Sequence, residues 1–225
     1  MAPENTLAAI RKALELGGDG VEFDVHGTAD GRPVLIHDHT VDRTTDGHGA
    51  VAELTLRQLQ ALDAGEWKSP AFAGEPIPVM EDALKLLAGR TMPVIEIKAD
   101  SISNDVVAAI QAAGLTEAVT VISFSADALR AVKAACASIR TALLVGGEGL
   151  TAHHVMALTR KARADHPDMF WSLATRDCVR ACHREGMPVW VWTVDDRHTM
   201  RRLIDRGVDG ITTNDPALLK AELEA

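Results

Sequence analysis

The sequence contains no tyrosine, few other aromatic residues, only three cysteines and no long hydrophobic run. Aromatic residues make up 4% of its 225 positions. Because no run of about 18 apolar residues occurs, no membrane-spanning helix is predicted. The cysteines, Cys136, Cys178 and Cys182, are an odd number in a chain of this size, which favours reduced thiols and an intracellular, cytoplasmic protein. A disulfide-stapled secreted domain is not expected.

Basic residues are also fewer than acidic residues. Lys and Arg together number 23 against 32 Asp and Glu, which gives a formal net charge of -9. No stretch concentrates Lys and Arg without acidic neighbours, so neither nucleic acid nor an anionic membrane surface is expected as the main partner. The length and the 47% of hydrophobic residues fit one globular domain, predicted to span residues 1–225, with its oligomeric state left open.

What the sequence does contain is a regular alternation of β-branched apolar runs with helix-patterned stretches. No linker interrupts this alternation, which is typical of an α/β protein with a parallel sheet. Helices are predicted near 4–16, 103–114, 176–185 and 196–206. Strands are predicted at 20–25, 33–38, 93–98, 118–124, 139–145, 169–173, 188–194 and 210–213.

The first two predicted strands are too close together for a parallel crossover. Only seven residues separate Val25 from the next strand, so a β-hairpin is predicted and the second strand should run antiparallel to the first. A turn centred on Ala29 and Asp30 would place Glu22 opposite His37. The hairpin is therefore expected to bring His37 beside the acidic residues of the first strand.

The remaining seven strands are one short of a closed (β/α)8 barrel. The chain opens with a helix that no strand precedes, so we expect a TIM-type barrel that lacks its first strand, in an N-terminally truncated chain. Such a chain would expose strand edges and is expected to aggregate or to unfold partly. An open doubly wound sheet is the alternative fold, but no Gly-rich phosphate loop of the usual spacing follows an early strand.

Three of the predicted strands end in ionisable residues that alternate with apolar ones. Side chains alternate along a strand, so Glu22 and Asp24 share one face of their strand, and Glu96 and Lys98 share one face of theirs. His37 follows at the end of the third. Because burying such charges unpaired is costly, their gathering at strand ends implies a divalent cation and an anionic ligand, for which phosphate is the natural candidate.

Plainer roles exist for each of these residues. Glu22 and Asp24 could form an exposed strand face, but a sheet covered by helices argues against this. Glu96 and Lys98 could pair only with each other, although such a pair contributes little when exposed and is unfavourable when buried. A lone histidine is ordinarily a core residue bonded to backbone, and only the acidic neighbours of His37 favour a chemical role.

Several motifs agree, in order and spacing, with those of one known family. They are Ala2-Pro3-Glu4-Asn5-Thr6-Leu7-Ala8-Ala9, Gly20-Val21-Glu22-Phe23-Asp24-Val25, Pro33-Val34-Leu35-Ile36-His37-Asp38, Asp42-Arg43-Thr44-Thr45, Ile95-Glu96-Ile97-Lys98, Ser123-Phe124, Val191-Trp192-Thr193-Val194 and Gly207-Val208-Asp209-Gly210-Ile211. On these motifs, which span nearly the whole chain, the protein resembles the glycerophosphodiester phosphodiesterases.

The resemblance implies a TIM barrel that uses a bound Ca2+ or Mg2+ to hydrolyse glycerophosphodiesters to glycerol 3-phosphate and an alcohol, in lipid metabolism. The family's metal-binding carboxylates correspond to Glu22, Asp24 and Glu96. One of its two catalytic histidines corresponds to His37, a general acid or base, and its phosphate-side lysine corresponds to Lys98.

The chain departs from the family at its beginning. Family members open with a strand that ends in His-Arg-Gly, and this chain has none, so a partner histidine and a phosphate-binding arginine would be absent. A catalytically impaired remnant is therefore one alternative, and a phospholipase D-like relative is another. Trp192, at the end of a predicted strand, is expected both to fill the barrel and to form a wall for the glycerol moiety. Glu4 and Asn5 are predicted at the start of the first helix, with a supporting role at the site left open.

Overall fold

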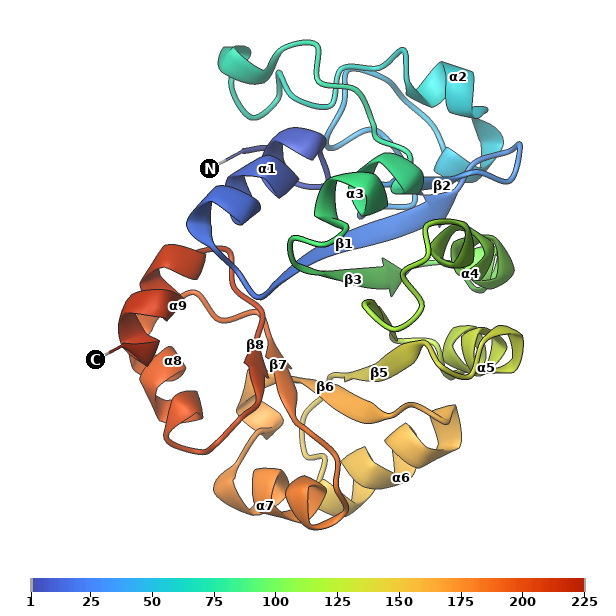
Figure 1. The fold of residues 1–225 in the computed structure, drawn as a ribbon. Coiled ribbons are helices and arrows are strands. Elements are labelled where there is room, and N and C mark those ends of the chain that lie inside the picture. The colour runs from blue at the N-terminus through green and yellow to red at the C-terminus, as the bar shows by residue number, and fades with distance from the viewer. Residues whose placement is uncertain (1, 225) are drawn as a thin grey trace.

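The computed structural model describes residues 2–224 as one curled sheet with helices around its outer face (Figure 1). The sheet has eight strands in the order β2-β1-β3-β4-β5-β6-β7-β8. Neighbouring strands run parallel except for β1 and β2, as the sequence predicts. The strands are β1 Gly20–Gly27, β2 Pro33–Leu35, β3 Met92–Ile97, β4 Thr120–Ser123, β5 Arg140–Val145, β6 His166–Phe170, β7 Trp190–Trp192 and β8 Gly210–Ile211.

Helices connect the strands, and most of them begin at a residue whose side chain accepts a backbone N–H of the first turn. Thr6, Ser125, Thr175 and Asp196 are such N-caps. None of the helices within residues 2–224 is long and apolar enough to cross a membrane. The helices are α1 Leu7–Leu16, α2 Leu56–Leu59, α3 Met80–Leu87, α4 Ser103–Ala112, α5 Ala126–Ala135, α6 Ala152–Ala162, α7 Arg176–Arg184, α8 Arg197–Ile204 and α9 Pro216–Leu223, with 3-10 turns η1 Val51–Glu53, η2 Pro70–Phe72, η3 Asp100–Ile102 and η4 Trp171–Leu173.

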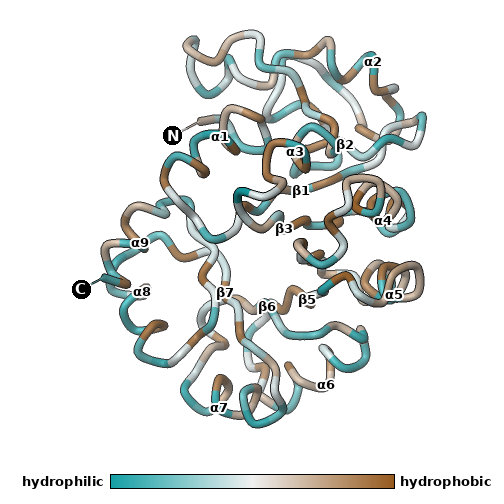
Figure 2. Tube along the Cα trace, viewed as in Figure 1, coloured by the Kyte–Doolittle hydropathy of each residue, from teal (hydrophilic) through white to brown (hydrophobic). Residues whose placement is uncertain are grey.

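The two faces of the sheet bury different sets of side chains. Phe23, Ile95 and Val121 belong to the large core between the sheet and the helices. A smaller cluster on the other face contains Val94, Ile122, Ala142 and Leu144, against which Trp190 and Trp192 pack. Figure 2 shows the apolar positions along the strands and on helix faces turned toward them, with hydrophilic positions outside. The predicted inward position of Trp192 is confirmed, Trp190 shares it, and the arrangement is that of an α/β barrel.

The sheet is open between its first parallel strand and its last. No backbone ladder joins β1 to β8 within residues 2–224, whereas α1 and α9 contact each other beside this gap. Within residues 2–224 no strand precedes α1, as the sequence predicts.

The predicted register of the β1–β2 hairpin is wrong by one residue. Val25 lies opposite Leu35. A turn centred on Ala29 and Asp30 would instead have placed Asp24 opposite Leu35 and Glu22 opposite His37. A shift of one residue sends every side chain of one strand to the other face of the sheet. β2 also ends at Leu35, so His37 follows the strand and is not part of it.

The connection between the two strands explains the shift. It is a five-residue loop closed by Thr28, whose N–H donates to the Arg32 carbonyl at 3.1 Å and whose hydroxyl accepts the Arg32 N–H at 2.9 Å. Gly31 lies in the left-handed region at φ 72°, where glycine is favoured. A loop with an odd number of residues reverses the pairing parity expected of a two-residue turn.

A lobe formed by residues 36–79 follows the hairpin, and beyond the end of the strand predicted at 33–38 the sequence analysis assigned no element to it. It has a small core that includes Val41, Val51, Leu59 and Ile77. One of its ties to the barrel is a hydrogen bond from the Ala8 N–H, in the first turn of α1, to the Glu75 carboxylate at 2.9 Å. The lobe therefore lies beside the start of α1 and carries the segment that contains His37.

Candidate active site

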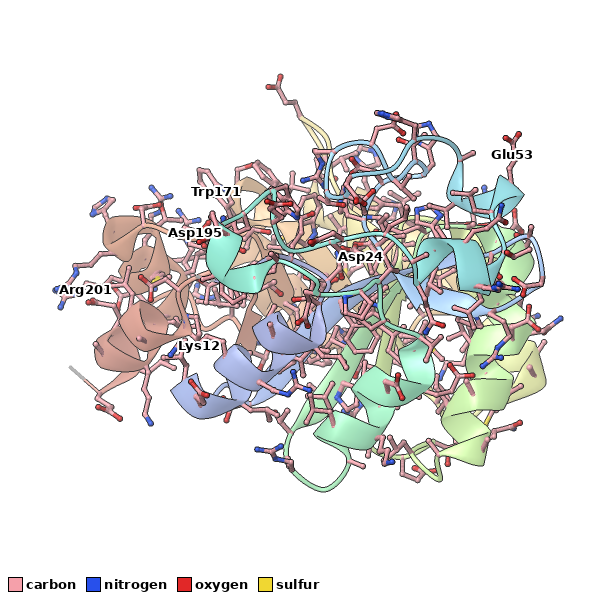
Figure 3. The ribbon with its side chains drawn as sticks, turned by 90° about the horizontal axis from the view of Figure 1, so that it is seen from above. Lys12, Asp24, Glu53, Trp171, Asp195 and Arg201 are labelled. Atoms are coloured by element: carbon pink, nitrogen blue, oxygen red, sulfur yellow. The ribbon has the colours of Figure 1, made fainter. Side chains whose placement is uncertain are left out.

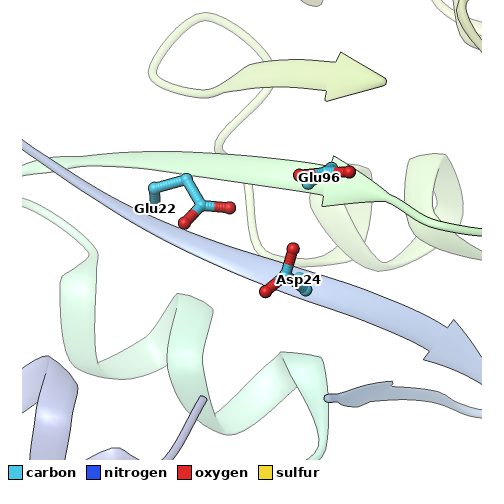
Figure 4. Close-up of side chains that lie close together, drawn as sticks. All are labelled: Glu22, Asp24 and Glu96. Carbon is cyan, nitrogen blue, oxygen red and sulfur yellow. The ribbon is translucent and has the colours of Figure 1, made fainter. Parts of the chain in front are cut away.

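Three carboxylates meet inside the barrel on two neighbouring strands. Glu22 and Asp24 lie on β1, Glu96 lies on β3, and Asp24 is directly opposite Glu96 in the parallel register. One oxygen atom from each side chain lies within 4.8 Å of the others. Figure 3 places Asp24 toward the middle of the molecule and Arg201 at its outer edge, and Figure 4 shows the three side chains converging. The alternation seen in the sequence thus brings these residues together.

Lys98 lies between two of these carboxylates. Its ammonium nitrogen Nζ is 2.8 Å from an oxygen of Glu96 and 3.1 Å from an oxygen of Asp24, and only 14% of its side chain is exposed. Burial alone would lower the pKa of Lys98, but the charges of Asp24 and Glu96 outweigh burial and raise it. Lys98 is therefore held in its charged form and shared by both acids, which differs from the simple pair with Glu96 that the sequence left open.

Asn5 holds Asp24 from the other side. Its amide nitrogen donates to an Asp24 carboxylate oxygen at 2.8 Å, while its carbonyl oxygen accepts the Asp24 backbone N–H at 2.9 Å. Asn5 adopts φ 54°, a left-handed conformation that asparagine tolerates better than most residues. The supporting role left open for Asn5 in the sequence is thus a direct grip on both the side chain and the backbone of Asp24.

The carboxylates carry more negative charge than Lys98 can offset. Burial, followed by the charges of Asp24 and Glu96, raises the pKa of Glu22 well above its usual value. Burial also raises the pKa of Glu96, although Lys98 opposes the rise. One oxygen of Glu22 is buried without a hydrogen-bond partner in the part of the chain that the structure describes. Burying a carboxylate oxygen without a partner costs free energy, and a further positive charge in the cluster would offset that cost.

A divalent cation fits this cluster. Three ionised carboxylates and one ammonium leave two negative charges, which one divalent cation would balance. The donors are all carboxylate oxygens, the ligands that Ca2+ and Mg2+ prefer. The unpartnered Glu22 oxygen supplies a free lone pair at the centre of the cluster.

His37 lies at the surface in a chain of charged groups. About half of its side chain, 52%, is exposed, and its Nδ1 atom is 2.7 Å from an oxygen of Asp38. Asp38 accepts from Arg43, and Arg43 also donates to Glu4. The hydrogen bonds from Arg43, followed by that from His37, hold the pKa of Asp38 well below its usual range. Within residues 2–224 no hydrogen bond joins the His37 ring to the three carboxylates.

Two other histidines are half-buried or buried. His26 is half-buried and its Nε2 atom lies 3.2 Å from the His37 carbonyl oxygen. His166 is buried at the start of β6 with its ring 4.7 Å from that of Trp190. Burial lowers the pKa of both imidazoles, so both are favoured in the neutral form.

Trp192 ends β7 and belongs to a row of aromatic rings. Its ring lies 5.4 Å from those of Phe124 and Phe170, and its indole N–H donates to the Asp168 carbonyl at 3.0 Å. Phe124, which directly follows β4, is 55% exposed. Gly146 passes so close that a Cβ there would lie 3.6 Å from the Trp192 ring. Trp192 thus lies at the carboxyl end of β7, and its role as a wall for the glycerol moiety stays a prediction.

Asp168 is an inward acid that the sequence analysis missed. It lies in β6 opposite Leu144 and Trp190, and neither of its carboxylate oxygens has a hydrogen-bond partner in the described part of the chain. Burial, with a further contribution from Glu96, raises the pKa of Asp168 to about 8. The predicted strand began at 169, three residues after the start of β6, so Asp168 was excluded from the inward set.

Replacing Asp168 with asparagine should weaken the pH dependence of stability. A carboxyl whose pKa is 3.8 when unfolded and about 8 when folded costs stability progressively as the pH rises between these values. The cost grows by up to about 1.4 kcal/mol per pH unit, and Asp168→Asn removes it. We therefore expect urea unfolding at pH 5, 6.5 and 8 with EDTA to show that the free energy of unfolding of the variant increases, relative to that of the natural chain, as the pH rises. The exposed Asp82→Asn is the control, and parallel pH profiles for Asp168→Asn and the natural chain would contradict the expectation.

Sequence comparison finds one family across nearly the whole chain. The profile of the "Glycerophosphoryl diester phosphodiesterase family" matches residues 1–218. Among curated proteins, the "Glycerophosphodiester phosphodiesterase" of Caldanaerobacter subterraneus subsp. tengcongensis is 40% identical over 223 residues, covering 96% of this chain and 90% of that protein.

Solved structures share the fold over nearly their whole length. The glycerophosphodiester phosphodiesterase of Agrobacterium tumefaciens superposes with a TM-score of 0.86 at 29% identity, covering 98% of this chain and 94% of that one. An Oleispira antarctica phosphodiesterase in complex with the product sn-glycerol-3-phosphate superposes with a TM-score of 0.88 at 26% identity, covering 100% and 92%. The predicted barrel is thus confirmed.

Proposed function

The chain belongs to the glycerophosphoryl diester phosphodiesterase family, and we propose that it acts, as one domain, to hydrolyse glycerophosphodiesters to glycerol 3-phosphate and an alcohol. Such a reaction belongs to the turnover of glycerophospholipids. The observation that supports it most is the group of three carboxylates on β1 and β3, two of which bind Lys98. The bound sn-glycerol-3-phosphate of the Oleispira enzyme supports a small phosphate ester as the ligand.

Glu22, Asp24 and Glu96 are the residues that would hold a divalent cation, Ca2+ or Mg2+. A cation bound there would offset the negative charge that develops on the phosphoryl group during hydrolysis. Asn5 fixes the Asp24 carboxylate through its amide and so keeps this ligand oriented.

Lys98 adds a second positive charge to the site. Two of its three ammonium hydrogens are directed to Asp24 and Glu96, and the third remains for a phosphoryl oxygen of the substrate. Because the lysine is mostly buried, its charge is screened less by solvent than a surface charge would be. We assign Lys98 to binding the substrate phosphate.

His37 is assigned to proton transfer. Its Nδ1 atom faces the Asp38 carboxylate, which fixes the Nδ1–H tautomer and leaves Nε2 to take a proton from the nucleophile or give one to the leaving alcohol. Arg43 holds Asp38 ionised, so the ring keeps this orientation. Trp192 would form, with Phe124, the apolar wall against the glycerol or alcohol moiety.

Release of glycerol 3-phosphate from glycerophosphocholine tests the proposal. We expect release with Ca2+ or Mg2+ and none with EDTA. His37→Asn should lower kcat by about 10²- to 10⁴-fold, the usual contribution of a general acid or base. His39→Asn, another exposed histidine two residues away, should leave the rate nearly unchanged.

The same assay separates the alternatives. A chain that binds a divalent cation by calorimetry yet releases no glycerol 3-phosphate would be an impaired remnant. Hydrolysis of phosphatidylcholine to phosphatidic acid and choline, without hydrolysis of glycerophosphocholine, would indicate phospholipase D-like cleavage. Full activity with EDTA would contradict the cation requirement.

A further inference from the structure

A second charged cavity lies on the outer wall of the barrel between α7 and α8. It measures about 400 Å³, within the size range of small-molecule sites. Figure 3 shows Arg201, one of its lining residues, at the edge of the molecule and well apart from Asp24. Its lining consists of Arg176, His198, Arg201, Arg202, Asp205 and Arg206.

The basic side chains are brought together by helix geometry. His198, Arg202 and Arg206 are spaced four residues apart along α8 and its C-terminal end, so they follow one stripe of the helix surface. Arg176, the first residue of α7, faces this stripe across the cavity. The stripe and Arg176 together form a concave basic surface.

Two of the guanidinium groups are held in place by neutral partners. Arg206 donates to the Ala174 carbonyl at 3.0 Å, and the guanidinium of Arg202 lies 5.4 Å from the centre of the Trp171 ring. Arg202 also donates from Nη2 to the Thr199 hydroxyl at 3.3 Å. These contacts orient the two side chains without neutralising them.

The cavity lacks matching negative charge. Arg201 and its neighbour Arg197 both pair with Glu222 of α9. In contrast, Arg176, Arg202 and Arg206 form no ion pair with any carboxylate within residues 2–224. The Nε atom of Arg202 is buried without a hydrogen-bond partner. Asp205 is the one acid in the lining, so positive charge exceeds negative charge there.

Crowding of these arginines is unfavourable unless something offsets it. Burial, followed by the charges of Arg202 and Arg176, lowers the pKa of Arg206, which shows that the three groups repel one another. The chain as a whole carries a net charge of -9, so three unpaired arginines in one cavity do not follow from its composition. An anion bound between them would relieve the repulsion.

We propose that this cavity is a binding site for a phosphate group, distinct from the carboxylate cluster. Guanidinium groups bind phosphate oxygens through paired N–H donors, and Arg176, Arg202 and Arg206 present such donors from two sides of the cavity. The phosphate belongs either to a free phosphate or phosphomonoester or to an anionic lipid headgroup. The inference goes beyond the proposed hydrolysis and does not depend on it.

Isothermal titration with inorganic phosphate, at matched ionic strength with EDTA, tests the site in the full chain. Arg176→Gln should weaken the binding by about tenfold, because it removes a charge-assisted hydrogen bond while sparing the contacts of Arg202 and Arg206. Arg202→Lys keeps the charge but loses the fork geometry and should weaken it as well. Arg180→Gln removes an exposed charge from the same helix outside the cavity and should have no effect.

A second arm distinguishes the two sources of phosphate. Co-sedimentation with neutral phosphatidylcholine vesicles, with and without phosphatidic acid, reports headgroup binding. Binding to the acidic vesicles that Arg176→Gln weakens and Arg180→Gln does not would assign the site to a lipid phosphate. If Lys98→Met still binds phosphate, the phosphate site lies outside the carboxylate cluster. Absence of binding in both arms, or equal loss in Arg176→Gln and Arg180→Gln, would overturn the proposal.

Discussion

Asp24→Asn is expected to reduce phosphodiester hydrolysis by about 10²- to 10³-fold, the scale seen when one electrostatic group is removed from an active site. The substitution keeps the size of the side chain but removes a negative charge that faces both Glu96 and Lys98. With one anionic ligand fewer, the remaining two carboxylates should also bind a divalent cation less tightly. The effect should therefore appear both in kcat/KM and in cation affinity measured by calorimetry.

Asp19→Asn is a matched control for this variant. Asp19 is exposed and lies just before the start of β1. Its replacement by asparagine removes one negative charge, as Asp24→Asn does, but away from the carboxylate cluster. It should leave both measurements close to those of the natural chain. If Asp24→Asn retained activity within about threefold, or lost activity with unchanged cation affinity, Asp24 would not be the ligand that we propose.

Lys98→Met is expected to lower the free energy of unfolding of the cation-free protein by about 3 to 5 kcal/mol, the usual cost of removing one partner from a buried ion pair. Asp24 and Glu96 would then lie buried side by side without their shared ammonium group. Burial already raises the pKa of Glu96, and losing Lys98, which opposes that rise, should raise it further, so the variant loses more stability as the pH rises. The deficit should accordingly be smaller at pH 5 than at pH 8.

Chemical denaturation at both pH values, with EDTA and then with Ca2+, measures this effect. Added Ca2+ should restore part of the lost stability, because it supplies the missing positive charge to the same carboxylates. The exposed Lys85→Met on α3 is the control. In the double variant with Asp24→Asn the deficit should be less than the sum of the two single effects. Additive losses, or a larger deficit at pH 5, would show that Lys98 does not compensate these acids.

The carboxylate cluster could be predicted because it depends on local geometry alone. Glu22 and Asp24 share a face in any extended strand, and Glu96 and Lys98 do likewise, whatever surrounds them. Parallel pairing of β1 with β3 then brings the two pairs together, although the connection between these strands contains β2, the lobe of residues 36–79 and α3. The alternation of strands and helices predicted the α/β fold for the same reason, because each element follows from its own local pattern.

The parts that sequence analysis missed depend on less regular geometry. The hairpin register follows from the five-residue loop closed by Thr28, which the sequence does not distinguish from a shorter turn. Asp168 follows Pro167, a residue that normally argues against a central strand, although β6 pairs on both sides. The lobe of residues 36–79 lacks long periodic segments and is held by turns and short helices instead.

Two consecutive segments of the chain form the two halves of the site. The polar side chains that bind one another at the cluster, from Asn5 to Lys98, all lie within the first 98 residues, whereas the rings of Phe124, Phe170 and Trp192 come later. Substitutions in distant, non-contacting parts of a protein tend to have independent effects. The later half can therefore diverge to accept a new alcohol group while the earlier half keeps its chemistry, and a designer could exchange the aromatic rim from another barrel without rebuilding the charged centre.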